Sequence, residues 1–223
     1  MFELKRLWWS GALALVLAAG GARAADDWET VEDEDALIKV RARSDINGKE
    51  VWAEKDVEAN AYDVQTALMD SGSFRHWMPY VKESRVVSTN PDGSRVAYAK
   101  LDLPMVDDRD YVISVVDEKK LTEDGQGEYV QRWKVVVDPG VPERKGVVRL
   151  KHNEGTWQVT SKGPNKTHIV YKFIVDPGGS VPDWLASFGQ KDGVMDTLGA
   201  VEKRARKLNE ERKKARPAAP KTP

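Results

Sequence analysis

The sequence contains no cysteine and only three histidines. Without cysteine, the chain forms no disulfide bond and offers no thiolate to a metal ion, so a hydrophobic core alone must hold the fold. His76, His152 and His168 lack the close spacing by which two histidines hold zinc. GxSxG and P-loop motifs are also missing, so we expect no catalytic residue, no metal ion and no cofactor.

The charges are nearly balanced, with 35 Lys and Arg residues against 36 Asp and Glu residues. This balance lacks the basic surplus that marks nucleic-acid-binding proteins, so we expect no nucleic-acid partner. Hydrophobic residues make up 40% of the 223 positions, which suffices for the core of one domain.

One long apolar run, residues 7–19, lies near the N-terminus. Lys5 and Arg6 precede it, and Ala22-Arg23-Ala24 follows with the small residues that a signal peptidase reads. Residues 1–24 are therefore expected to be a secretory signal peptide, which exports the protein to the periplasm or the extracellular space. A retained membrane anchor is the alternative, although the run is shorter than the roughly 20 residues that span a bilayer.

The next part of the sequence predicts a hairpin followed by a helix. Apolar and polar residues alternate over 37–43 and 49–57, and Asn47-Gly48 between them favours a tight turn. Residues 59–70 carry apolar residues at helical spacing. The acidic segment before the hairpin, residues 26–35, is expected to be a solvated and partly ordered start.

Beyond Val81 the pattern is strand and turn. The expected strands are 83–89, 95–103, 110–117, 128–138, 147–152, 156–160 and 167–175. Their connections are too short for a crossover helix, so neighbouring strands should be antiparallel. Residues 192–215 then place apolar side chains at spacings of three and four, which predicts a long helix with a solvated basic face. Residues 216–223 are typical of a disordered tail.

This order of elements predicts one α+β domain over residues 25–215. The fold would be a helix-grip, in which a curved antiparallel sheet grips the C-terminal helix. Asp176-Pro177-Gly178-Gly179 ends the last strand, and Pro182 precedes an amphipathic helix that contains Trp184 and Phe188. Because glycine permits a hinge and proline favours a helix start, we expect this helix to close as a lid over a buried ligand.

The chain also resembles the START domain family of lipid-binding proteins. The similarity rests on Asp108-Arg109-Asp110-Tyr111-Val112, on Lys145-Gly146-Val147-Val148-Arg149, on His76-Trp77 with Val81, and on Asp176-Pro177-Gly178-Gly179 with Pro182 and Trp184-Leu185. The resemblance implies a tunnel that holds one sterol, phospholipid or ceramide molecule. We further expect a monomer that touches membrane surfaces transiently.

The resemblance also shows a departure. Sterol-binding members carry a second arginine six residues after the one in the Arg-Asp pair, whereas this chain has Val115 at that position. An apolar residue cannot orient a hydroxyl, which argues against cholesterol and for an apolar or differently anchored ligand.

The resemblance and the expected fold suggest which residues contact the ligand. They are Trp77, Tyr98, Arg109, Tyr111, Trp133, Arg149, Phe173, Trp184, Phe188, Met195 and Leu198. Arg109 stands beside three aspartates and is expected to form a buried salt bridge, with a headgroup contact as the alternative. Arg149 lies either on a solvated strand face or inside the tunnel as a polar anchor. Strand tryptophans such as Trp133 and Trp157 are more often core residues than ligand contacts.

An exported, non-catalytic carrier or sensor of one lipid is the leading hypothesis for the function. The rival hypothesis is an enzyme that resembles the polyketide aromatase/cyclases, which would need polar groups inside the hollow. A module that recognises another envelope protein without a ligand is the third.

Overall fold

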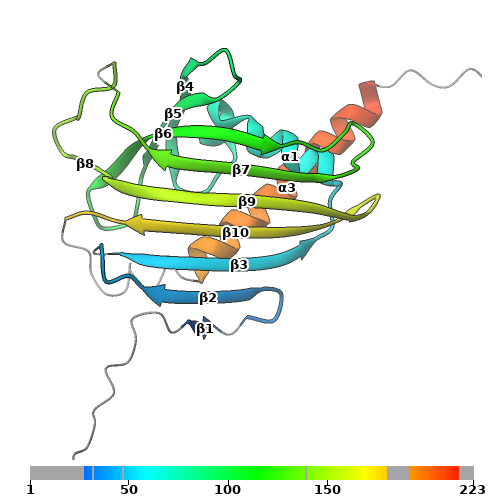
Figure 1. Cartoon of the computed structure of the whole chain (residues 1–223), viewed down its shortest axis with the longest axis horizontal. Coiled ribbons are helices and arrows are strands. Elements are labelled where there is room, and N and C mark those ends of the chain that lie inside the picture. Colours follow the sequence, from blue (N-terminus) through cyan, green and yellow to red (C-terminus); the bar gives the residue numbers. More distant parts are fainter. Residues whose placement is uncertain (1–27, 32, 47, 139, 180–190, 216–223) are drawn as a thin grey trace, which may run out of the picture.

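The computed structural model describes residues 28–215 apart from positions 32, 47, 139 and 180–190. Figure 1 shows one curved sheet with a long helix behind it. The elements are β1 (Glu29–Val31), β2 (Leu37–Ala42), β3 (Lys49–Val57), α1 (Ala61–Met69), η1 (Ser71–His76), β4 (Val81–Thr89), β5 (Arg95–Leu101), β6 (Asp108–Lys119), β7 (Glu128–Val135), β8 (Val147–Arg149), β9 (His152–Gly163), β10 (Lys166–Asp176) and α3 (Asp192–Ala215).

The sheet has the strand order β1-β2-β3-β10-β9-β7-β6-β5-β4, and every neighbouring pair in this order is antiparallel. The join between β3 and β10 brings the first three strands against the last one. The predicted curved antiparallel sheet with a long C-terminal helix is therefore confirmed, as is the predicted hairpin of β2 and β3.

The structure departs from the strand predictions at two places. β8 pairs with β6 in the parallel direction, because β7 stops opposite Ile113 and the returning chain fills the open edge of β6 at residues 108–110. The acidic start contains β1, where Thr30 pairs with Lys39 of β2. Neither strand exceeds three residues, and so neither shows an alternating pattern in the sequence.

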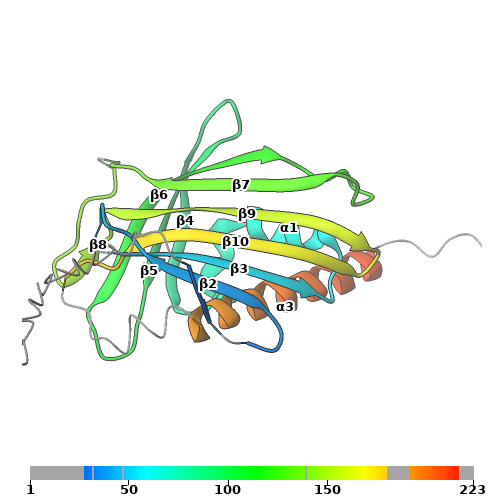
Figure 2. The same cartoon turned by 60° about the horizontal axis from the view of Figure 1, so that its bottom comes forward.

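Both helices cover the same face of the sheet (Figure 2). The stripe Val194, Leu198, Val201 and Ala205 of α3 is buried in one core with side chains from β2, β3, β9 and β10. We call this the inner face and the opposite side the outer face. Because cross-strand partners share a face and successive residues alternate, the register assigns every strand residue to one of the two.

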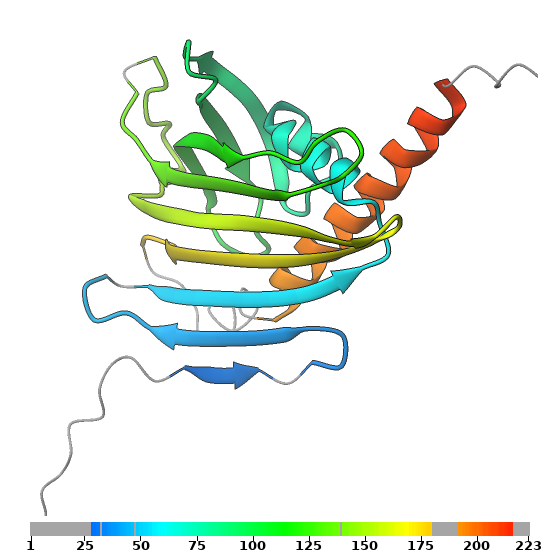
Figure 3. The same ribbon diagram turned by 45° about the vertical axis from the view of Figure 1, so that its right-hand side comes forward.

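Polar side chains cap the start of α1 and attach α3 to it. The Asn60 side chain accepts a hydrogen bond from the Tyr62 N–H at 3.0 Å, which caps α1. Arg212 of α3 pairs with the buried Asp63 of α1 at 2.7 Å, and in Figure 3 the two helices lie close together. The basic face of α3 is thus partly used to attach one helix to the other, rather than wholly solvated.

Gly178 and Gly179 both have positive φ, of 63° and 64°, as expected for a turn after β10. The predicted lid helix and the tail 216–223 lie outside the described residues. Within the described residues, no helix is both long and apolar enough to cross a membrane.

Candidate functional site

A row of aromatic side chains lies on the inner face at the middle of the sheet. This aromatic row consists of Trp133 from β7, Trp157 from β9, and Tyr171 and Phe173 from β10. Trp157 stands opposite Tyr171, and their rings stack with centroids 3.8 Å apart. Tyr171 lies 4.7 Å from Phe173 and 6.1 Å from Trp133 between ring centroids. Such ring pairs contribute about 0.5–1.5 kcal/mol beyond their burial, so the row forms a firm platform.

A glycine makes room for the row. Gly155 of β9 stands between Trp133 and Phe173 in the register. A Cβ atom at this position would collide with the Trp133 indole and with the carbonyl oxygen of Lys172. The missing side chain lets the indole extend across β9, where its Nε1 donates a hydrogen bond to Asn153 Oδ1 at 3.0 Å.

The members of the aromatic row differ in how deeply their side chains are buried. Trp157 is 6% exposed and belongs to the core. Trp133, Tyr171 and Phe173 are only half-buried, although they pack against that core. These partly free rings face the helix side of the sheet, and so they are the surface that a buried ligand would contact.

Two tyrosines on the inner face carry phenols that make no hydrogen bond with any part of the described chain. Burial raises the pKa of Tyr111 to about 12. Burial also raises the pKa of Tyr171, and the nearby Tyr111 adds to that effect. Both residues are half-buried, so these two hydroxyls are open to a ligand or to water.

The helix side of the inner face contributes further predicted residues. Leu198 of α3 is fully buried in the core. Met195 of α3 and Trp77, just after η1, are half-buried and pack against the same core. The Trp77 indole also donates a hydrogen bond to Ser73 Oγ at 3.2 Å. The structure therefore brings these three predicted residues to the same side of the sheet as the aromatic row.

A buried polar cluster lies on the inner face near α1. Burial opposes ionisation of Asp117, but hydrogen bonds from Arg95, Gln131 and Tyr129 outweigh this effect and lower its pKa. Gln131 also donates to the Leu68 carbonyl of α1, at 3.5 Å. The carboxylate is thus satisfied by its own neighbours, which gives this cluster a structural role.

Arg109 is 3% exposed, but the carboxylate partner predicted for it is not among the described residues. Its Nη1 donates to the carbonyl oxygen of Asp107, and its Nε donates to the carbonyl of Pro177 at 3.4 Å. Arg109 therefore ties the start of β6 to the turn that follows β10. Asp108 and Asp110, its neighbours in the strand, point to the opposite face, so Arg109 forms no salt bridge with them.

Tyr98 and Arg149 belong to a different cluster, on the outer face. Arg149 forms two hydrogen bonds with the fully buried Asp110, Nε to Oδ1 at 2.6 Å and Nη2 to Oδ2 at 3.1 Å. The Tyr98 hydroxyl donates to Asp110 Oδ2 at 3.3 Å, and Arg149 also donates to the Val141 carbonyl of the β7–β8 connection. These two predicted ligand contacts therefore line no part of the inner face, a correction that follows from the strand register.

The remaining predicted contacts, Trp184 and Phe188, lie outside the described residues. Across the ranges that are described, no cluster of His, Cys, Asp and Glu side chains could hold a metal ion.

Comparison with known proteins places this geometry in a family. A family model for polyketide cyclase / dehydrase and lipid transport matches residues 57–202. The chain belongs to this family. A STAR-related lipid transfer protein from Xanthomonas axonopodis, solved as a fragment, is 30% identical with a TM-score of 0.67, over 81% of this chain and 99% of that one. We therefore refer to the protein as a START-like domain.

Two further sequences and two further solved structures resemble this START-like domain. An uncharacterized Pseudomonas aeruginosa protein, PA1579, is 31% identical over 87% of this chain and 94% of its own length. Phosphatidylcholine transfer protein from Rattus norvegicus is 31% identical over 58% of this chain and 60% of its own length. Human STARD10, at 20% identity and a TM-score of 0.71, and the ZhuI aromatase/cyclase from Streptomyces, at 14% and 0.53, share the fold.

Two residues of the candidate site, Tyr171 and Gly155, were not predicted from the sequence. Tyr171 stands two positions before Phe173 in one strand, so the alternation of faces could have placed both on the inner face. Gly155 gave no signal, because a strand glycine reveals its role only when the neighbouring Trp133 is located.

Proposed function

We propose that this START-like domain binds one lipid molecule between the aromatic row and α3, and that it transfers or senses this lipid without catalysing a reaction. The observation that carries the proposal is the pair of unpartnered phenols, Tyr111 and Tyr171, beside half-buried rings on the inner face. Rings offer an apolar surface, and phenols offer fixed hydrogen bonds to the polar part of an amphipathic ligand.

The energetic reason for such a carrier is the cost of apolar surface in water. A lipid with a dozen exposed methylene groups costs on the order of 10 kcal/mol to bring into water, at about 0.8 kcal/mol per group. An inner face that includes Trp133 and Phe173 removes most of this cost for the ligand.

A phospholipid is the ligand class we propose. Phosphatidylcholine transfer proteins of four mammals are among the relatives, each over 60% of its own length. The faces of aromatic rings attract the quaternary ammonium group of a choline head. Val115, buried on the inner face, supplies no charge that could orient a sterol hydroxyl, so a sterol is the second choice.

Lipid exchange requires contact with a membrane, and one end of the sheet suits this contact. Met105, between β5 and β6, is 85% exposed, and Val137, between β7 and β8, is 97% exposed. Both connections lie at the end of the sheet where β10 stops, since Arg109 and Arg149 join them to β6 there. We propose that this end meets the bilayer, with the segment around Trp184 and Phe188 acting as the lid.

The export signal completes the proposal. The mature domain would act outside the cytoplasm, in the periplasm or beyond, as a monomer. Intact-mass measurement on protein from its native host tests export, because the mature chain should begin at Ala25. A chain that keeps residues 1–24 would instead indicate a membrane anchor.

The alternative is an enzyme of the aromatase/cyclase type. The family description, which includes polyketide cyclases, and the similarity to the ZhuI structure support this alternative. Tyr111 and Tyr171 would then have to take part in proton transfer. Because their pKa values lie above the ordinary value of 10.0, both phenols keep their protons at neutral pH and cannot act as bases. This protonation favours hydrogen bonding to a ligand over proton abstraction.

The test is mass spectrometry of the protein under native conditions, followed by solvent extraction. We expect one lipid per chain, lost in the variant that carries both Trp133→Ala and Phe173→Ala, and retained in Trp52→Ala on the outer face. A vesicle-to-vesicle transfer assay with fluorescent phosphatidylcholine should show the same order. Protein that binds no lipid but converts a polyketide analogue would establish the alternative.

A further inference from the structure

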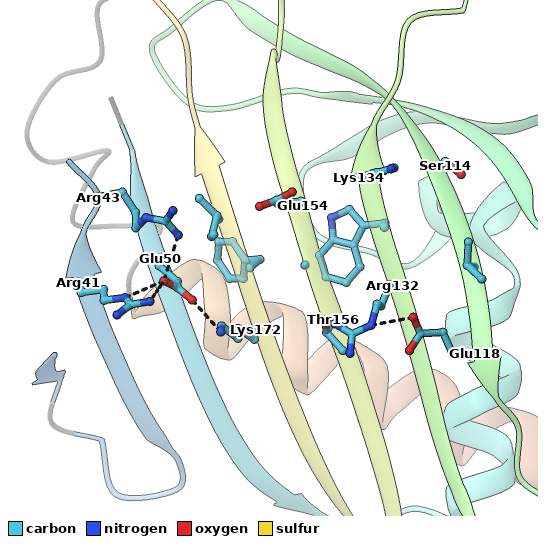
Figure 4. Close-up of a pocket in the computed structure, with 15 residues that line it drawn as sticks. Arg41, Arg43, Glu50, Ser114, Glu118, Arg132, Lys134, Glu154, Thr156 and Lys172 are labelled. Atoms are coloured by element: carbon cyan, nitrogen blue, oxygen red, sulfur yellow. Dashed lines mark hydrogen bonds and ion pairs between the residues drawn. The ribbon is translucent and has the colours of Figure 1, made fainter. Parts of the chain in front are cut away.

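The outer face contains a hollow of about 570 Å³ (Figure 4). A volume of this size suits a small molecule. Its walls come from β2, β3, β10, β9, β7 and β6, and its lining includes Arg41, Arg43, Arg132, Lys134, Lys172, Glu50, Glu118 and Glu154. Five of these residues are cationic and three are acidic, although the whole chain carries a formal net charge of −1.

Two of the three carboxylates pair with cations of the hollow. Glu118 Oε1 lies 2.8 Å from Arg132 Nε, and Glu50 is held by several cations. Glu50 is 1% exposed and accepts hydrogen bonds from Arg41 at 2.6 Å and Arg43 at 3.4 Å, while Lys172 Nζ lies 2.8 Å from it. Burial opposes its ionisation, but the contacts with Lys172 and Arg41 outweigh this and lower the pKa of Glu50. Glu50 therefore acts as a fixed anchor that positions the Lys172 ammonium at the wall of the hollow.

The strand register places three hydrogen-bond donors in one line. Arg132 stands opposite Thr156, and Thr156 stands opposite Lys172. Because neighbouring strands are about 4.8 Å apart, the two cations lie on either side of the threonine, with about 10 Å between their strands. No acidic residue stands within this line of three, although Glu118 of β6 pairs with the Nε of Arg132 and leaves its Nη2 free of that contact.

The chemistry of the line favours an oxyanion. Arg132 Nη1 donates to Thr156 Oγ1 at 3.1 Å, so the threonine hydroxyl keeps its own proton for another acceptor. Lys172 has three N–H donors, and only one is directed at Glu50. Guanidinium, ammonium and hydroxyl groups together are the donors that bind tetrahedral oxyanions such as phosphate.

We propose that Arg132, Thr156 and Lys172 form a binding site for a small phosphate-bearing solute on the outer face, separate from the lipid site. The cation Lys134 lies beside the line and adds attraction, whereas Glu154, opposite Lys134, opposes it. The two sites share β10, since Lys172 points outward between Tyr171 and Phe173, which point inward.

The experiment is an NMR titration of the folded protein with inorganic phosphate, with chloride keeping the ionic strength constant. We expect saturable shifts of the amides at 132, 156 and 172, with a dissociation constant in the millimolar range or below. Arg132→Gln should weaken binding about tenfold, and the isosteric Thr156→Val several-fold. Glu154→Gln should strengthen binding, because it removes a repelling charge without removing a donor.

Lys162→Gln is the matched control. Lys162 lies on the outer face of β9 near its end, 3.1 Å from Asp56, and is not part of the hollow. This variant should bind phosphate as the unmodified protein does. Shifts that do not saturate, or an equal weakening in Lys162→Gln and Arg132→Gln, would show general charge screening and reject the site. Unchanged binding in Thr156→Val, with unchanged melting, would also reject it.

Discussion

The inner and outer faces of the sheet are built from alternate residues of the same strands, yet the polar groups around the aromatic row and those of the outer face are paired differently. On the inner face the row around Tyr171 has few polar atoms, and two phenols have no partner among the described residues. On the outer face charged side chains are numerous and joined in ion pairs, such as those of Glu50 with its cations.

The difference distinguishes polar groups that hold the fold from polar groups that await a ligand. A buried group without a partner costs about 1–3 kcal/mol, so native structures keep few of them. The half-buried phenols bear part of this cost unless a ligand or water binds them, which points to binding, and the paired cluster of Asp110 and Arg149 points to stability. The following predictions test this division from the largest expected effect to the smallest.

Trp157→Ala should destabilise the protein most. Trp157 is buried in the core and stacked on Tyr171, and truncation of a core aromatic typically costs about 3–5 kcal/mol. Trp52→Ala on the outer face should cost less than half as much, because Trp52 is only half-buried. Urea denaturation of the two variants measures both values. Equal losses would remove the basis for treating the faces differently.

Asp110→Asn should come next, at about 3 kcal/mol or more. It leaves the Arg149 guanidinium without its charged partner inside the cluster, and a broken buried pair costs more than an exposed one. The exposed pair of Lys119 and Glu128 provides the control, since Lys119→Gln should change stability by less than about 1 kcal/mol. Thermal melts compare the two. A melt of Asp110→Asn equal to that of Lys119→Gln would contradict the buried-pair assignment.

Tyr111→Phe and Tyr171→Phe should weaken lipid binding while leaving the fold intact. Each change removes one hydroxyl, and a hydrogen bond to a ligand contributes about 0.5–1.5 kcal/mol, or up to about tenfold in affinity. Tyr98→Phe is the matched control, because Tyr98 faces the outer side and donates to Asp110. Binding of a fluorescent phospholipid should fall in the first two variants alone. Equal binding in all three would leave the phenols without a role.

The pH dependence of stability should separate the two faces at opposite ends of the scale. The pKa of Tyr111 is raised from 10.0 to about 12, so its contribution is present below pH 10 and is lost as the pH rises toward 12. The pKa of Glu50 is lowered from 4.5, so its contribution is present above that value and is lost as the pH falls below it.

Denaturation curves across the pH range measure both effects. Tyr111→Phe should flatten the alkaline loss of stability, and Glu50→Gln should flatten the acid loss. If the two variants lose stability at alkaline and acid pH as the unmodified protein does, then Tyr111 is not buried and Glu50 is not held by its cations.

The elements that the sequence predicted well are those with a local signal. The helix over 192–215 has a repeating apolar stripe, and the hairpin around Gly48 has two alternating strands and a turn sequence. β1 and β8 lack such a signal, because three residues show no period. Their pairing depends on strands elsewhere, and for β8 on the edge of β6 that β7 leaves open.

Site residues were predicted correctly where the residue type alone indicated the role. They were missed where the role depends on the face of the sheet to which the side chain points. Trp133 and Phe173 were expected from residue type and do lie on the inner face. Arg109 was assigned to the acids beside it in sequence, but Asp108 and Asp110 face the other way in the same strand. The direction of a strand residue depends on register, which long-range pairing decides.

The join of β3 to β10 has a consequence for how the chain is made. Val57 pairs with Thr167, so β3 has no partner on that edge until nearly the whole domain has been synthesised. Until then, the apolar side chains Val51, Ala53 and Ile38 are exposed beside an open strand edge, which is the arrangement that most readily aggregates. The nascent chain therefore has a long vulnerable interval, and a chaperone that shields an unpaired hairpin would act on β2 and β3 first.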